Sequence, residues 1–233
     1  MRFTAVVRRP SFAVWAVSCP DYRLVLVRRG RFRRCGVDLD RTVGYLGVPG
    51  EEERFAHPAG GDECTSVSLS ADLGSRLVGA ARPAVYVDAR MELAHRWLLA
   101  GAADADYAVV EALLALLARS PAPGRAGDRA LVALAREALA AGDPAADGLL
   151  SLAESLGVSP YRLSRAFTRE LGVSLTRYRN RLRVGVVLDR LARGEQHLAR
   201  LAADLGFADQ AHLCRTVRAH VGHTPTAVRR LLV

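Results

Sequence analysis

The hexapeptide Leu152-Ala-Glu-Ser-Leu-Gly157 returns 49 residues later as Leu201-Ala-Ala-Asp-Leu-Gly206. The similarity then continues at a shift of 50, because the second copy has one extra residue in its turn. The positions that return are Leu163, Arg165, Gly172 and Ser174, as Leu213, Arg215, Gly222 and Thr224. Each copy predicts a short helix, a turn at glycine and a longer helix. This is the layout of a helix-turn-helix, whose second helix enters the major groove of DNA while the first braces it.

Helical signals surround both copies. Ser159-Pro160 and Thr224-Pro225 each supply an N-cap followed by proline at the first helical position, and glycines stand where helices should stop. The helices expected are 129–141, 148–156, 160–171, 175–192, 198–205, 210–221 and 225–232. The helix over 175–192 should be about 27 Å long at 1.5 Å per residue. A rod of that length can set two recognition helices in successive major grooves, about 34 Å apart.

Positive charge gathers in the same region. Residues 149–233 hold 14 Arg and 6 acidic residues, a net charge of +8, whereas residues 1–148 hold 19 Arg and 18 acidic residues, a net charge of +1. All the residues counted as basic are arginine and none is lysine, so a high arginine content is by itself weak evidence for DNA binding. The difference in net charge between the two parts of the chain does not depend on this preference for arginine. A basic block on a neutral remainder indicates a module that binds phosphates, because the release of counterions from DNA favours such surfaces.

The front of the chain has the pattern of a β-rich domain. Strand-length apolar runs over 12–17, 22–27, 31–34, 44–48 and 65–69 alternate with turn residues and predict a small β-barrel or sandwich. Two amphipathic helices follow, one around Met91 to Leu98 and one around Tyr107 to Leu117. Ser120-Pro-Ala-Pro-Gly-Arg-Ala-Gly127 is the best linker, so we expect domains over 1–120 and 128–233 joined by a linker over 121–127.

The second half closely resembles the DNA-binding domain of the AraC/XylS family of bacterial regulators, over about 128–232. The matching stretches are 152–167, Gly172-Val-Ser174, Tyr178 with Arg183, 201–210 and Gly222-His-Thr-Pro225. The resemblance implies a sequence-specific transcriptional regulator, and for the front half a cupin-like barrel for effector binding and dimerisation. Leu213 and Val217 depart from the family, which commonly has Phe there, and Gly185 interrupts the joining helix.

Candidate DNA contacts follow from the helix faces and from the family positions. In the first recognition helix Leu163, Phe167 and Leu171 share an apolar face, which turns the polar positions outward. The candidates there are Tyr161, Arg162, Ser164, Arg165 and Arg169, and in the second copy Gln210, Ala211, His212 and Arg215. Arg pairs with guanine, Gln with adenine, and Tyr or Ala meets the thymine methyl group.

Phosphate contacts are expected from the joining helix. Arg183 is the residue carried over from the family pattern, and Arg177, Arg179 and Arg181 resemble it. Alternating residues on a helix cannot all face one way, so some of these arginines must be ordinary solvated charges. The competing interpretation is that each arginine of the recognition helices is an ordinary solvated surface residue. For His212 this interpretation and a DNA contact have equal weight.

Double-stranded DNA is the expected partner, and RNA polymerase, a small-molecule effector and a second copy of the chain are further candidates. We expect no cofactor and no metal. Cys19, Cys35, Cys64 and His57 could form a sensing site, but cysteine is also a good small core residue, and that interpretation is favoured. No apolar run approaches the roughly 20 residues that span a bilayer, which predicts a cytoplasmic protein without membrane contact.

Three alternatives compete with a regulator. A cupin-type dioxygenase needs a His/His/Glu metal set, and a DNA-repair methyl acceptor needs a cysteine-rich zinc cluster, and neither pattern is found in the sequence. An adaptor that has lost DNA binding would not be expected to keep Arg165 and Arg215. The sequence does not identify the operator or the effector, nor whether the protein activates or represses.

Overall fold

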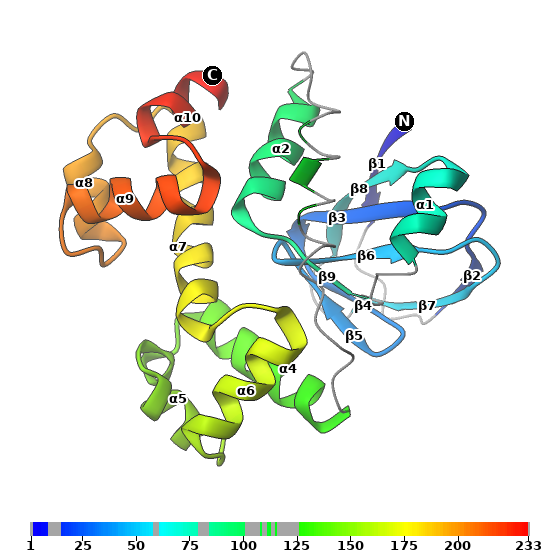
Figure 1. Cartoon of the computed structure of the whole chain (residues 1–233), viewed down its shortest axis with the longest axis horizontal. Helices are drawn as coiled ribbons and strands as arrows, with labels where there is room; N and C mark the ends of the chain where they lie inside the picture. Colours follow the sequence, from blue (N-terminus) through cyan, green and yellow to red (C-terminus); the bar gives the residue numbers. More distant parts are fainter. Residues whose placement is uncertain are drawn as a thin grey trace. The chain divides into compact units, whose positions relative to one another are not determined.

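The computed structural model describes residues 2–8, 15–57, 61–78, 84–100, 108, 111–112, 115 and 126–232. These residues divide into two compact units (Figure 1). The first takes in the described residues up to Val87 and residue 115, and the second begins at Asp88 and contains all the helices from residue 126 onward.

The first unit is built from two antiparallel sheets. The five-stranded sheet has the order β1 (Arg2–Arg8), β8 (Asp62–Ser68), β3 (Arg23–Gly30), β6 (Val43–Gly47) and β9 (Val85–Tyr86). The four-stranded sheet has the order β2 (Trp15–Ser18), β7 (Glu52–Ala56), β4 (Phe32–Arg34) and β5 (Val37–Leu39). Buried apolar residues of β3, β6 and β8, such as Leu24, Leu46 and Val67, fill the core, and a short helix α1 (Ala71–Val78) follows β8.

The expectation of a strand-rich front half is confirmed, but the barrel expected from the resemblance is not. Among the described strands no ladder joins the two sheets, and a single bridge between Asp40 and Val43 lies in the turn between β5 and β6. The strands β1, β5, β7 and β9 and the helix α1 had no counterpart in the sequence analysis. Most of these segments are short or carry charged residues, so their apolar pattern is weak. Of the second expected amphipathic helix, around 107–117, only isolated residues are described.

The second unit is helical. Its elements from residue 126 onward are α4 (Ala126–Ala141), η1 (Pro144–Asp147), α5 (Leu149–Ser155), α6 (Pro160–Leu171), α7 (Leu175–Ala192), α8 (Leu198–Asp204), α9 (Gln210–Val221) and α10 (Pro225–Leu232). The predicted ends of α6, α7, α9 and α10 agree with these bounds. The expected cap of α10 is present, with the Ala227 amide donating to Thr224 Oγ1 at 3.3 Å.

Each copy of the repeat closes its own small core at one end of α7 (Figure 1). In the first copy Leu152, Leu163 and Phe167 are fully buried, and the Phe167 ring meets Tyr178 of α7 edge to face at 5.1 Å. In the second copy Leu213 and Val217 are fully buried against the carboxyl-terminal half of α7. The two side chains that depart from the family pattern are therefore fully buried in a packed core.

One helix from before the expected linker belongs to this unit. The helix α2 (Ala89–Leu99) begins at Asp88, whose side chain accepts hydrogen bonds from the Arg90 and Met91 amides. Its Ala89 and Leu93 lie in the same hydrophobic cluster as the buried residues of the second copy. From the sequence we expected α2 to belong with the strands, because an apolar stripe shows that a helix is buried but not which core buries it.

No helix in the described part of the chain is long and apolar enough to cross a membrane.

Candidate nucleic-acid interface

The helices α6 and α9 start and stop in the same way. Ser159 Oγ accepts a hydrogen bond from the Arg162 amide at 3.2 Å, and Asp209 Oδ1 accepts one from the His212 amide at 2.6 Å. Both helices end at a left-handed glycine, Gly172 and Gly222. The turns before them also need a left-handed glycine, with φ of 64° at Gly157 and 69° at Gly206. These shared backbone features explain why the repeat conserves its glycines, and they give two recognition helices of 12 residues each.

The first turns of α6 carry an exposed tyrosine and arginine that are held together. Tyr161 is 68% exposed, and Arg165 Nη1 donates to its hydroxyl oxygen at 2.6 Å. The guanidinium carbon lies 5.4 Å from the ring centroid, as the i, i+4 spacing allows. This hydrogen bond raises the pKa of Arg165, which stays charged. Four of its five N–H donors remain free to meet a base edge. Arg162 is exposed beside this pair, and Ser164 is half-buried.

The first turns of α9 present a comparable set. Gln210, Ala211 and Arg215 are exposed. His212 is half-buried, its Nδ1 accepts from the Ala208 amide at 3.2 Å, and its ring meets Phe207 edge to face at 5.5 Å. An accepting Nδ1 leaves Nε2 as the only ring donor, so His212 has a fixed tautomer here. Its position is set by the turn as much as by the helix.

Two other candidate arginines have protein partners. Arg169 Nη1 forms an ion pair with Asp128 Oδ2 of α4 at 2.5 Å, which ties α4 to α6. The guanidinium carbon of Arg183 lies 5.9 Å from the Phe207 ring centroid, so a side chain of α7 reaches the turn of the second copy. The structure thus brings Arg183 towards the second recognition unit, whereas it holds Arg169 against α4.

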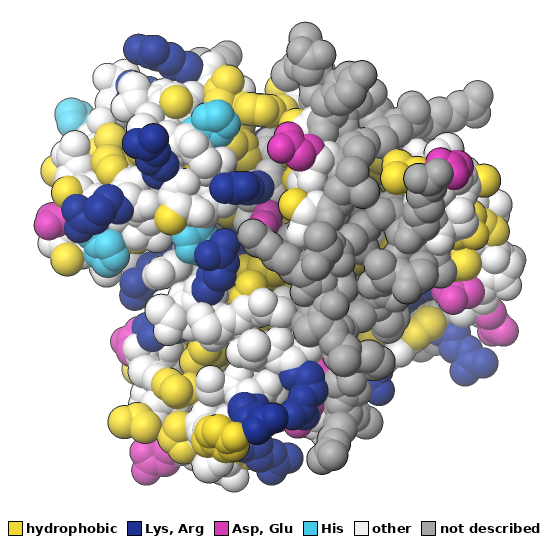
Figure 2. Space-filling view, viewed as in Figure 1, with side chains coloured by type: hydrophobic (Ala, Val, Ile, Leu, Met, Phe, Trp, Pro, Cys, Tyr) yellow, Lys and Arg dark blue, Asp and Glu magenta, His cyan; other side chains and the backbone are white. Residues whose placement is uncertain are grey.

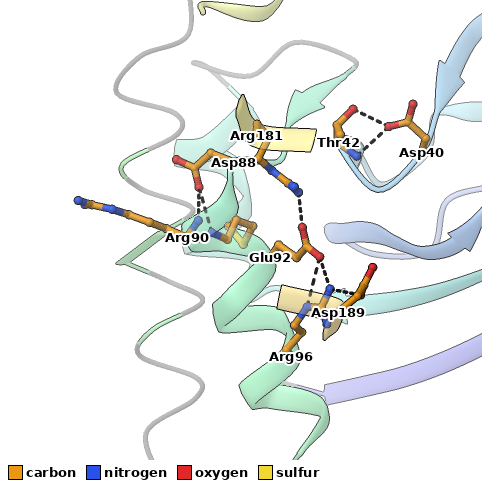
Figure 3. A network of polar contacts seen from close by, with 9 residues as sticks. Asp40, Thr42, Asp88, Arg90, Glu92, Arg96, Arg181 and Asp189 are labelled. Carbon is orange, nitrogen blue, oxygen red and sulfur yellow. Dashed lines mark hydrogen bonds and ion pairs between the residues drawn. The ribbon is translucent and has the colours of Figure 1, made fainter. Parts of the chain in front are cut away.

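Of the remaining arginines on α7, Arg181 does not fit the expectation of a phosphate contact. Its side chain is 2% exposed, and its Nη2 lies 2.6 Å from Glu92 Oε2 of α2. The other carboxylate oxygen of Glu92 accepts from Arg96, which also bonds Asp189 of α7 at 2.7 Å (Figure 3). Helical periodicity did not reveal this burial, because the sequence pattern could not place α2 beside α7. Arg177 is exposed, and Arg179 lies 3.6 Å from Asp147.

This ion pair accounts for the glycine inside α7. A glycine within a helix costs about 1 kcal/mol relative to alanine. At Gly185 a Cβ atom would lie 3.0 Å from Arg181 Nη1 and 3.5 Å from Glu92 Oε2. The glycine therefore leaves room for the buried guanidinium and its partner. In the sequence alone, Gly185 is only an interruption of the helix.

Residues 152–231 match the helix-turn-helix domain family, a range that runs from α5 into α10 and includes both copies of the repeat. This chain carries an AraC-type helix-turn-helix domain. The resemblance to the AraC/XylS family is thereby confirmed for this part of the chain, and the protein is a DNA-binding transcriptional regulator, as predicted. A search of curated proteins found no match.

Several solved structures are similar to the chain. The carboxyl-terminal domain of AraT, a response regulator from Geobacillus stearothermophilus, is 28% identical over 43% of this chain and 84% of its own, with a TM-score of 0.40. An AraC-type regulator from Chromobacterium violaceum is 24% identical over 47% of this chain and 97% of its own, with a TM-score of 0.42. ToxT from Vibrio cholerae O395 is 12% identical over 99% of this chain and 98% of its own, with a TM-score of 0.40.

Arginine side chains are spread over the surface of the AraC-type domain in the view of Figure 2. The exposed ones near the starts of the recognition helices are Arg162, Arg165 and Arg215. In the described part of the chain no carboxylate forms an ion pair with these three arginines, whereas Arg169, Arg181 and Arg190 each contact at least one. Exposed positive charge without a carboxylate partner is therefore present where both helices begin, which suits an anionic partner.

His220 provides a pH-dependent feature of the same domain. Burial, together with the nearby Arg177 and Arg181 guanidinium groups, lowers the pKa of His220 to about 4, and Asp88 opposes this shift. A histidine with a lowered pKa stabilises the fold above its unfolded pKa of about 6.5, and this contribution is lost as the pH falls towards 4.

Between pH 7 and pH 4.5 we expect the free energy of unfolding to fall by on the order of 1–2 kcal/mol more in wild type than in His220→Gln. Urea unfolding at both pH values measures this. The exposed His197→Gln variant should behave as wild type, and equal losses in all three proteins would contradict the prediction.

The candidate sensing residues of the first unit are mostly inside it. Cys19 and Cys64 are buried, and Cys64 Sγ donates to Asp62 Oδ2 at 3.0 Å. His57 is buried beside the same carboxylate, which its Nδ1 approaches. Cys35 is exposed in a turn. Among the described residues no group of three His, Cys, Asp or Glu is arranged to hold a metal ion.

Proposed function

We propose that this regulator binds duplex DNA sequence-specifically and reads two subsites, one with α6 and one with α9. The observation that carries the proposal is the matching exposure of the first turns of these two helices at opposite ends of α7. The α7 helix has 18 residues, which at 1.5 Å per residue gives a rod of about 27 Å. Successive major grooves on one face of DNA lie about 34 Å apart, so both helices can be inserted together.

The base contacts in this proposal come from the exposed first turns. Arg165 and Arg215 pair with guanine, and Gln210 pairs with adenine. Tyr161 and Ala211 meet thymine methyl groups, while Arg162, Ser164 and the Nε2 donor of His212 supply further hydrogen bonds. Arg169, already paired with Asp128, has at most a phosphate-facing role in this arrangement.

Arg183 contacts a phosphate in this proposal, beside the turn of the second unit. Arg183→Ala should weaken binding to all sequences alike and reduce the slope of log K against log salt by about 1. Titration of one duplex at several salt concentrations measures the slope. Arg54→Ala is the matched control, because Arg54 is an exposed arginine of β7 in the first unit. A variant that keeps the wild-type slope but changes base preference would contradict the phosphate assignment.

The proposal is tested by sequencing the genomic fragments that the purified chain retains in the presence of excess unrelated DNA. We expect a small set of fragments that share a motif. Retention of fragments without a shared motif would contradict sequence-specific binding.

For the front of the chain the proposal keeps the predicted organisation, with α2 assigned to the DNA-binding part. Residues 1–120 otherwise serve as a cupin-like effector and dimerisation domain, 121–127 as a linker, and 128–233 as the core of the DNA-binding domain. A small-molecule effector, RNA polymerase and a second copy of the chain are its proposed partners beside DNA, and the cytoplasm its proposed location. The proposal includes no catalytic activity.

A further inference from the structure

The helix α2 contributes both charge and apolar surface to the second helix-turn-helix. We propose that Glu92 is a positioning residue for DNA binding, which acts through Arg181 to hold α7 and α9 in the arrangement that reads the second subsite. The inference rests on the proposed function, because it concerns how the second recognition helix is presented to DNA.

Four charged side chains that alternate in sign join the two helices, and they are largely removed from water. Glu92 and Arg96 come from α2, and Arg181 and Asp189 come from α7, so the four charges sum to zero (Figure 3). The Arg181 side chain is 2% exposed and that of Glu92 8%. Removing the Glu92 carboxylate takes away the close ionic contact of a buried guanidinium, which is strongly destabilising, whereas replacing both members of such a pair with apolar residues is often tolerated. Arg181 therefore needs α2 in place.

The apolar contacts of α2 also support the second copy. Val217 is the residue of the second copy that corresponds to Phe167 in the first, so the second recognition helix has a smaller side chain at this position. The cluster around Val217 and Leu213 includes Ala89 and Leu93 of α2, with Trp97 packed against it. The Trp97 ring also lies 6.1 Å from that of His223, just after α9. The helix α2 thus completes a core that the second copy fills less than the first.

The first copy is supported by a different helix. Its core packs against α4, which is tied to α6 by Asp128 and Arg169. A change at Glu92 should therefore reach the second copy and leave the first intact. The chain enters α2 directly after β9, through Val87 and Asp88. The segment that ends the sheet of the first unit therefore continues into the helix that supports the second copy.

Hydrogen exchange of the full chain without DNA tests the structural part. In Glu92→Gln we expect amide exchange on the order of tenfold or more faster in α9 and in 184–192 of α7, with α5 and α6 unchanged. Glu154→Gln is the matched control, because Glu154 is an exposed glutamate of the same unit. A double variant, Glu92→Met with Arg181→Met, should return exchange close to wild type. Unchanged exchange in Glu92→Gln, equal acceleration in α5 and α6, or no recovery in the double variant would each overturn the proposal.

DNA binding by the same proteins tests the functional part. The probes are a duplex selected from a random library by the wild-type protein and the same duplex with its second subsite scrambled. For Glu92→Gln we expect affinity for the intact duplex to fall on the order of tenfold, close to the value for the scrambled one, with single-base effects in the first subsite retained. A Glu92→Gln protein that still distinguishes the two duplexes as wild type does would overturn the positioning role alone. A wild-type protein that binds both alike would overturn the proposed function and the positioning role with it.

Discussion

Arg165→Ala is expected to weaken binding to a two-subsite operator by about 5- to 150-fold and to relax base preference at one subsite only. The range corresponds to the roughly 1–3 kcal/mol carried by a good bidentate contact with guanine. Arg165 can make that contact because it is exposed near the start of α6 and is oriented by the Tyr161 hydroxyl. Binding to a library of single-base operator variants at fixed salt gives both the affinity and the base preference.

Arg215→Ala is the partner experiment, because the repeat places Arg215 at the position of Arg165. It should relax preference at a second subsite about one helical turn away from the first. Arg218→Ala is a suitable control, since Arg218 is exposed on the same helix but lies nearer its end. If Arg165→Ala and Arg215→Ala both lowered affinity equally for every library member, the two arginines would be phosphate anchors.

Phe167→Ala is expected to lower the free energy of unfolding by about 3–5 kcal/mol, as is usual when a buried aromatic side chain is truncated to alanine. Phe167 is fully buried and packs edge to face on Tyr178, whose hydroxyl oxygen accepts from Arg136 Nε of α4 at 3.4 Å. Its loss should therefore disturb α4 and α7 as well as α6. Urea unfolding at pH 7 measures the change.

Val217→Ala, at the corresponding position of the second copy, is the matched comparison. It removes a smaller side chain from an equally buried site, so we expect a smaller loss, about 1–3 kcal/mol. The two variants should also differ in DNA binding, with the first subsite affected by Phe167→Ala and the second by Val217→Ala. A larger loss of stability for Val217→Ala than for Phe167→Ala would contradict the packing described for the two cores.

The helical half of the chain could be predicted from its sequence because local signals agree with one another. Ser159-Pro160 and Gly172 mark the ends of α6, and both ends are found where the caps require them. The strands of the first unit gave weaker signals. The strand β7, Glu52–Ala56, consists largely of charged residues, and its Glu53 is buried with Arg23 and Arg34 as partners. A periodic pattern of apolar residues does not reveal a strand whose inward positions are ionic.

The candidate interface was predictable in part for the same reason. Surface positions follow from helical periodicity, which correctly turned Tyr161, Arg165 and Arg215 towards solvent. Pairing across elements does not follow from it. The ion pairs of Arg169 with Asp128 and of Arg181 with Glu92 join residues 41 and 89 positions apart in the sequence, and only the packing of the helices brings them together. The room that Gly185 leaves for Arg181 likewise depends on α2.

The most direct test of the central claim is selection of bound sequences from a random duplex library by the full chain at fixed salt. Two recognition helices joined by α7 predict a motif with two specified blocks whose centres lie about 10–10.5 base pairs apart. Single-base preferences in one block should disappear in Arg165→Ala and those in the other in Arg215→Ala. A single specified block, or enrichment of no motif at all, would contradict the account of two subsites read by α6 and α9.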